Sequence, residues 1–201
     1  MGEYKYKVFL EKILKSNYTS NFNYDSGVFD KFYTPFLGWM EYKILDLLEE
    51  KSEKIKFDIE SICKSILCST KEGLIEICLK TLITEFYNFK AKEIDQNING
   101  EYYKTYNKRF EEIKNIGEIL NKYEGLSYLI YQRLSRQYNL LDEVINHLID
   151  DIDLIRNKFK KNLQSLCSIR MNSGDSHNDG KSVMILNFNS EEKIVYKPHC
   201  L

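Results

Sequence analysis

Apolar side chains recur at helical spacing through most of residues 1–160 of this 201-residue chain. Such stripes, with steps of three and four residues, predict amphipathic helices, because these positions share one face of a helix. The predicted helices cover residues 3–16, 35–50, 58–67, 70–89, 103–120, 124–136 and 140–159. The last of them is expected to bury Val144, Leu148, Ile152, Ile155 and Phe159.

Residues with capping character mark three of these helix starts. Thr34 is expected to cap the helix that Pro35 begins, since threonine accepts backbone hydrogen bonds there and proline fits the first turn. Asp58 and Thr70 are expected to cap the next two helices. The two caps therefore predict that residues 58–89 form two separate helices.

Aromatic residues are concentrated around Pro35, where Phe29, Phe32, Tyr33 and Phe36 follow one another closely. A cluster this dense could line a ligand site, but packing against another helix is the commoner outcome. We therefore expect these rings to form a contact between helices.

The pattern changes at about Lys161, after which short β-rich runs at 163–170, 182–188 and 193–197 predict strands. The predicted fold is mainly α with a short antiparallel β region (α+β), divided into a helical region, 1–160, and a β-rich region, 161–201. A three-stranded antiparallel sheet would leave an edge that needs a further strand or a covering helix, and the sequence pattern offers neither.

Composition narrows the possible partners. The 29 basic and 30 acidic residues nearly balance, so no overall field favours nucleic acid or a membrane surface. No apolar run approaches the roughly 18 residues of a membrane span, and no signal peptide is visible. The five cysteines lack the spacing of a metal site, and Cys63, Cys68 and Cys78 are expected to be buried thiols. These features predict a cytoplasmic protein.

His147 lies one helical turn from Asp150 and Asp151, a spacing that could hold a metal ion. The alternative is a solvated acidic face beside a half-exposed histidine. We favour the second interpretation and predict no metal site, because no further cluster of ligands supports the first.

A polar stretch before the second predicted strand is the candidate site. Gly174 and Gly180 bracket Asp175 and His177, and the last strand carries Lys197. Glycines let backbone N–H groups approach phosphate oxygens, and a lysine supplies positive charge. The pattern is that of a phosphate-binding loop, although an ordinary polar hairpin loop also fits.

These residues resemble the signature of type 2 lanthipeptide (lantibiotic) synthetases, in the N-terminal part of their dehydratase domain. The resemblance rests on Gly174-Asp175-Ser176-His177, on Gly180-Lys181-Ser182-Val183 and on Val195-Tyr196-Lys197-Pro198. An aromatic–proline segment at 29–36 and the helix with Tyr123 and Leu126 are also similar. The resemblance spans most of the chain, and its specific part is residues 171–201.

The resemblance implies that the helical region leads into the start of a kinase-like small lobe. The complete domain would use ATP and Mg²⁺ to phosphorylate Ser and Thr of a precursor peptide, and would then eliminate phosphate. The resemblance assigns catalytic roles to Asp175, His177 and Lys197. The nucleotide would be held by Gly174, Asp175, His177, Gly180, Lys181 and Lys197. The zinc site of the family's separate cyclase domain is not in this chain.

Two departures from the family pattern weaken the expected grip on phosphate. Lys181 stands where arginine is usual, which keeps the charge but loses the planar fork. His199 also stands where arginine is usual. Phosphoryl transfer further needs carboxylates that follow the lysine strand in kinase-like folds. We therefore expect a truncated dehydratase, inactive alone, that needs the downstream part of the synthetase. The alternatives are a non-catalytic peptide-binding or subunit-interaction module, and a pseudogene product.

Overall fold

The computed structural model describes residues 3–16, 18–20, 27–51, 54–92, 101–171, 183–189 and 191–198. Its fold is mainly α with a small sheet, which confirms the predicted fold class. The chain forms two compact units, unit 1 from residues 1–39 and 71–133, and unit 2 from residues 40–70 and 134–201. Three helices contribute residues to both units, α2 (Asp30–Glu50), α3 (Ile59–Lys92) and α6 (Glu124–Phe159). The predicted boundary at about residue 160 stays a prediction.

Unit 1 also contains α1 (Glu3–Lys15), α4 (Tyr102–Lys108), the 3-10 turn η2 (Arg109–Glu111) and α5 (Ile113–Lys122). Its core is aromatic, because the cluster around Pro35 packs against α4 and η2. The ring of Phe32 lies 5.3 Å from that of Phe110, and the ring of Phe29 lies 5.9 Å from that of Tyr106. The prediction of a helix contact at this cluster is confirmed.

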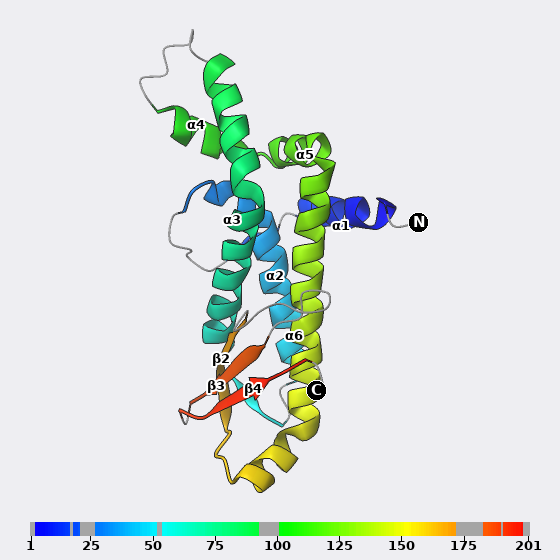
Figure 1. Ribbon diagram of the computed structural model, residues 1–201, viewed down its shortest axis with the longest axis vertical. Coiled ribbons are helices and arrows are strands. Elements are labelled where there is room, and N and C mark those ends of the chain that lie inside the picture. The colour runs from blue at the N-terminus through cyan, green and yellow to red at the C-terminus, as the bar shows by residue number, and fades with distance from the viewer. Residues whose placement is uncertain are drawn as a thin grey trace. The chain divides into compact units, whose positions relative to one another are not determined.

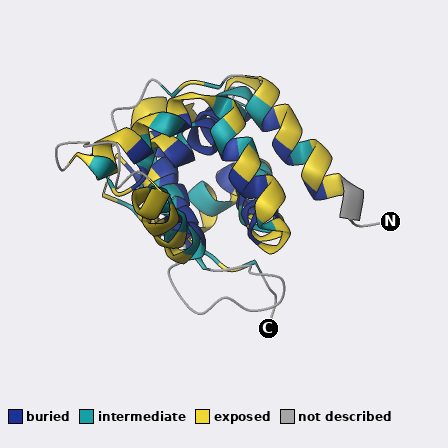
Figure 2. Ribbon diagram, turned by 90° about the horizontal axis from the view of Figure 1, so that it is seen from above, coloured by how far each residue is buried: buried dark blue, intermediate teal, exposed yellow. Residues whose placement is uncertain are grey.

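Gly38 permits a close approach within unit 1. A Cβ atom at this position of α2 would lie 2.9 Å from the backbone carbonyl atoms of Tyr18. Real Cβ atoms do not pack so closely, so α2 contacts the segment 18–20 only because a glycine is present there. Figure 2 shows the buried and exposed sides of the helices, as the apolar stripes predict.

Unit 2 holds the sheet, in the order β1 (Lys56–Phe57), β2 (Ser165–Arg170), β3 (Met184–Phe188) and β4 (Lys193–Tyr196). Figure 1 shows β2, β3 and β4 beside the second half of α6. The backbone N–H of Ile169 donates to the Ser65 hydroxyl of α3 at 3.3 Å, which ties the sheet to that helix. Buried aliphatic side chains such as Ile66, Leu141 and Leu166 fill this unit.

The sheet is four-stranded and mixed, so the predicted three-stranded antiparallel sheet was wrong. The short β1 pairs parallel with β2, and Asp58 N–H donates to the carbonyl of Leu166 at 2.9 Å. Two residues are too few to show the alternation of apolar and polar side chains that predicts a strand. β1 is a strand because it pairs with β2. β1 covers the edge of β2 that the sequence pattern left open.

Several predicted helices are continuous. Residues 59–92 form one helix, in which the Thr70 hydroxyl donates to the carbonyl of Ile66 at 2.8 Å instead of capping a new helix. Residues 124–159 likewise form one helix rather than two. Asp58 does cap α3, because its carboxylate accepts a hydrogen bond from the N–H of Ser61 at 3.2 Å.

Three other details also differ from prediction. Helix α2 begins at Asp30 and not at Pro35, which is accommodated in its second turn. The predicted helix over 103–120 is broken at η2, between α4 and α5. Phe159 is 61% exposed because it lies at the end of α6, and Ile155 is only half-buried.

Candidate functional site

The β3–β4 hairpin positions Lys197, the one residue of the candidate site that the structure describes. Met184 pairs with Tyr196 and Leu186 with Ile194, and the turn between the strands has Glu191 at a φ of 61°. The alternate residues Met184, Leu186 and Phe188 are buried. Opposed residues of an antiparallel pair share a face, so Tyr196 faces the protein interior. Lys197 follows directly and is exposed.

The sheet brings one end of the candidate loop, before β3, next to Lys197, and the other end, after β2, lies two strands away from it. Arg170, at the end of β2, pairs with Ile185, and Met184 pairs with Tyr196. The last residues of β2 and β4 and the first residues of β3 therefore lie at one end of the sheet. The order of strand, loop, strand and lysine strand predicted this arrangement. The predicted residues Gly174, Asp175, His177, Gly180 and Lys181 lie outside the described residues.

Two residues of α6 hold the end of β4. The Tyr196 hydroxyl donates to Oε1 of Glu143 at 3.0 Å and lies 2.9 Å from Nδ1 of His147. Because the hydroxyl proton points to the carboxylate, the phenol oxygen is left to accept from Nδ1–H of the imidazole. Burial and the hydrogen bond to Glu143 raise the pKa of Tyr196 to about 12. This network fixes the backbone immediately before Lys197.

His147 takes part in this network on an exposed face of α6. The imidazole is exposed and its Nδ1 contacts a tyrosine rather than a carboxylate of α6. Within the described parts of the chain, no group of three or more His, Cys, Asp or Glu side chains could hold a metal ion. The prediction that His147 belongs to no metal site stays a prediction.

Sequence reasoning missed a second cation at this end of the sheet. Arg170 is exposed. It pairs with Ile185 of β3, which in turn pairs with Val195 of β4. Two strand spacings therefore separate the backbone of Arg170 from that of β4, a distance of about 10 Å. Together, Arg170 and Lys197 could contact two groups of an extended polyanion such as a nucleotide phosphate chain. The strand pairing that brings them together was visible in the pattern, but the register was not.

The cysteines divide between buried and accessible positions. Cys63 and Cys78 are buried, and burial raises the pKa of each thiol to about 12, so both stay protonated and unreactive. Cys68 is exposed, which corrects the prediction that it is buried. Cys68 lies five residues after Cys63 on the same helix, and at about 100° per residue this places it on another side of α3.

One family model matches the C-terminal part of the chain. Residues 123–201, which include α6 and the sheet strands β2 to β4, match the model of a domain of unknown function (DUF4135). No curated protein matches the sequence. In the described residues, no helix is long and apolar enough to cross a membrane.

Proposed function

We propose that this chain is the N-terminal part of a lanthipeptide synthetase-like dehydratase, and that the end of its sheet forms one side of the nucleotide site. The observation that carries the proposal is the strand register, which brings Lys197 and both ends of the loop that resembles the family signature to the same end of the sheet. The match over residues 123–201 supports it, because that family is associated with lanthipeptide synthetase-like proteins.

The described residues fit part of a phosphate site. Lys197 is exposed, and in the described part of the chain no carboxylate forms an ion pair with it, so its charge is available to an anion. Tyr196, held by Glu143, keeps the preceding backbone in place. Arg170 adds a planar guanidinium on a neighbouring strand, where it could offset the absence of arginine at positions 181 and 199.

ATP with Mg²⁺ would supply the phosphoryl group that activates a Ser or Thr hydroxyl of a precursor peptide for elimination. In this proposal Lys197 neutralises phosphate charge and the loop 174–181 covers the phosphates. The resemblance gives Asp175 a catalytic role, and phosphoryl transfer would also need the carboxylates that follow the lysine strand in kinase-like folds.

Reconstitution tests this function directly. The chain is mixed with the remaining part of a dehydratase of the same gene cluster, the precursor peptide, ATP and Mg²⁺. Mass spectrometry should then detect peptide that has lost water. Each protein alone and the mixture without ATP serve as controls and should give unmodified peptide. Unmodified peptide from the complete mixture would contradict the proposal.

A further inference from the structure

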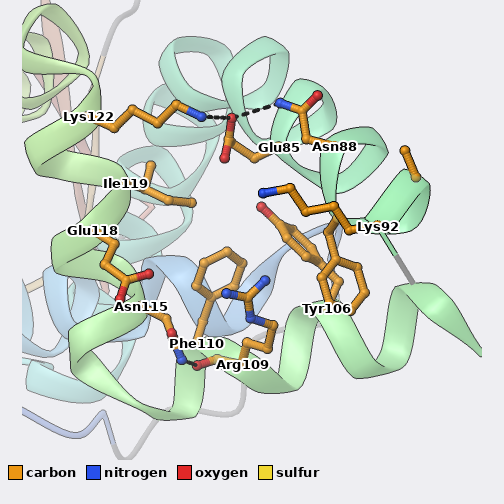
Figure 3. Close-up of a pocket in the computed structure, with 12 residues that line it drawn as sticks. Glu85, Asn88, Lys92, Tyr106, Arg109, Phe110, Asn115, Glu118, Ile119 and Lys122 are labelled. Atoms are coloured by element: carbon orange, nitrogen blue, oxygen red, sulfur yellow. Dashed lines mark hydrogen bonds and ion pairs between the residues drawn. The ribbon is translucent and has the colours of Figure 1, made fainter. Parts of the chain in front are cut away.

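A cavity of about 890 Å³ lies within unit 1, between the end of α3, α4, η2 and α5 (Figure 3). Its volume falls in the range of about 300–1,000 Å³ that is typical of ligand pockets. Phe89, Phe110 and Ile119 give it an apolar wall, while Lys92 and Arg109 bring positive charge. The nucleotide site proposed above includes none of these residues.

Arg109 is held in place, and its guanidinium N–H groups have no hydrogen-bond partner among the described residues. Its guanidinium carbon lies 5.1 Å from the centroid of the Phe89 ring and 5.9 Å from that of Tyr106. The Asn115 side-chain amide donates to the Arg109 carbonyl at 2.6 Å, which fixes the backbone of the turn. These cation–π contacts need no N–H group as a hydrogen-bond donor, so the guanidinium can still bind a planar anion through two hydrogen bonds. No carboxylate among the described residues forms an ion pair with Arg109.

Tyr106 supplies a second donor without a partner. Its side chain is only 3% exposed, and its hydroxyl has no hydrogen-bond partner in the described structure. Buried polar groups are rarely left in this state unless a water or a ligand completes them. In Figure 3 the Tyr106 hydroxyl, the Lys92 ammonium and the Arg109 guanidinium all point into the cavity.

The acidic residues of the wall limit the charge of the ligand. Glu85 accepts hydrogen bonds from Lys122 at 2.8 Å, Tyr123 at 2.7 Å and Asn88 at 3.1 Å. Burial opposes its ionisation, but these three bonds together lower the pKa of Glu85, so it stays negative. Glu118 adds a further negative charge at the rim. A single carboxylate is therefore favoured over a doubly charged phosphate.

We propose that this cavity binds a carboxylate that is joined to an apolar or aromatic group. The carboxylate binds the guanidinium of Arg109 and the hydroxyl of Tyr106, and the apolar group packs on Phe110 and Ile119. The carboxylate is either the side chain of an acidic peptide residue with an apolar neighbour or a free small acid. This site does not rest on the proposed dehydratase function.

Calorimetric titration of the full chain tests the site with four probes. Two carry the carboxylate, N-acetyl-Glu-Phe-amide for a peptide source and 3-phenylpropionate for a free acid. N-acetyl-Gln-Phe-amide and inorganic phosphate are the controls. At least one of the two carboxylates should show saturable binding. Both controls should bind at least about tenfold more weakly. The Gln peptide loses the charged hydrogen bonds, and the charge of phosphate does not match the site.

Variants separate recognition from folding. Arg109→Lys keeps the charge and loses the fork, and should weaken carboxylate binding about tenfold. Tyr106→Phe should also weaken binding, by several-fold, yet leave the midpoint of thermal unfolding unchanged or higher, since it removes an unsatisfied buried hydroxyl. Arg136→Lys, at an exposed residue of unit 2, is the matched control and should bind as the parent does.

The outcomes distinguish the sources and can overturn the site. Tighter binding of the peptide supports a peptide ligand, and equal or tighter binding of 3-phenylpropionate supports a free acid. The proposal is overturned if neither carboxylate saturates the protein, if phosphate binds equally well, or if both Arg109→Lys and Tyr106→Phe bind as the parent does.

Discussion

Unit 1 is packed around aromatic rings, whereas unit 2 is packed mainly around aliphatic side chains. The rings of Phe32, Phe36 and Phe110 are buried in the first, and Ile66 and Leu166 are among the buried residues of the second. Rings are large and rigid, and tyrosine adds a polar tip that needs a partner. Aliphatic side chains fill space more evenly and carry no such requirement.

The difference appears in the tyrosine hydroxyls of the two units. Tyr33 and Tyr106 of unit 1 have buried hydroxyls without a partner in the described structure. In unit 2, the Tyr196 hydroxyl lies at the end of the sheet and is hydrogen-bonded to Glu143. An aromatic core thus leaves donors and space for a ligand, while the aliphatic core supports a strand end with fixed geometry.

Shortening a buried side chain in each core should have the largest effect on stability. Phe32 and Ile66 are both fully buried. Phe32→Ala should lower the free energy of unfolding by about 4 kcal/mol and Ile66→Ala by about 3 kcal/mol, through lost burial and the cavity left behind. Urea unfolding followed by circular dichroism measures both. A cost below about 1 kcal/mol for Phe32→Ala would contradict an aromatic core that stabilises unit 1.

The close packing at Gly38 should give the next largest effect. Gly38→Ala introduces a Cβ atom 2.9 Å from the backbone of Tyr18, so α2 or the segment 18–20 must move. We expect a loss of about 2 kcal/mol in urea unfolding. Gly125→Ala is the control, because its Cβ would meet nothing within 4 Å, and it should stabilise the helix by about 0.5 kcal/mol. Equal effects of the two changes would show that the contact with Tyr18 does not matter.

Removing the Tyr196 hydroxyl tests how unit 2 holds its strand end. Tyr196→Phe should cost about 1 kcal/mol at neutral pH, since a partly exposed hydrogen bond to a carboxylate is lost. Faster amide hydrogen exchange in β4 than in the parent protein should accompany the loss. Unchanged exchange in β4 would mean that Glu143 and His147 do not fix this strand.

The pH dependence of the same pair gives a second measure. The pKa of Tyr196 is raised from 10.0 to about 12, so the folded state holds the proton more tightly than the unfolded state. Its contribution to stability is complete below pH 10 and is lost as the pH rises towards 12. The difference in unfolding free energy between parent and Tyr196→Phe should therefore shrink over this interval.

Replacing Glu85 by Gln should have the smallest effect on the free energy of unfolding, and this effect should depend on pH in the acidic range. The pKa of Glu85 is lowered from 4.5, with burial outweighed by the bonds from Lys122, Tyr123 and Asn88. The contribution of Glu85 to the free energy of unfolding is present above pH 4.5. It is lost as the pH falls through the pKa that Glu85 has in the folded protein, which is below 4.5. The advantage of the parent over Glu85→Gln in urea unfolding should thus disappear on acidification. A constant difference at all pH values would argue against an ionised Glu85.

Most helices and strands could be predicted from the sequence. Apolar residues at steps of three and four predict amphipathic helices, and short β-rich runs predict strands. Capping residues misled the prediction at Thr70, where a side chain that can cap a helix also fits its interior by bonding to Ile66. β1 could not be predicted, since Lys56 and Phe57 become a strand only through pairing with β2. Continuity of α3 and α6 depends on packing, which local sequence signals do not reveal.

The candidate site was predictable in its strand order but not in its supports. Lys197 and the hairpin followed from the pattern, and the register between β3 and β4 gave the geometry. Glu143 and His147 were not identified as partners of Tyr196, because residues far apart in sequence give no local signal of contact. The cavity around Arg109 could not be predicted either, because its residues lie far apart in the sequence. In addition, the sequence pattern predicts one continuous helix over 103–120, where the structure has a break at η2.

The rate of water loss in the reconstituted mixture most directly tests whether Lys197 supplies the phosphate-binding cation, as proposed. Lys193 is the matched control, since it is exposed at the start of β4, whereas Lys197 directly follows the end of that strand. Lys197→Ala should slow dehydration by about a hundredfold or more, as expected when a positioned electrostatic group is removed, while Lys193→Ala should leave the rate unchanged. Dehydration at the parental rate by Lys197→Ala would contradict the claim.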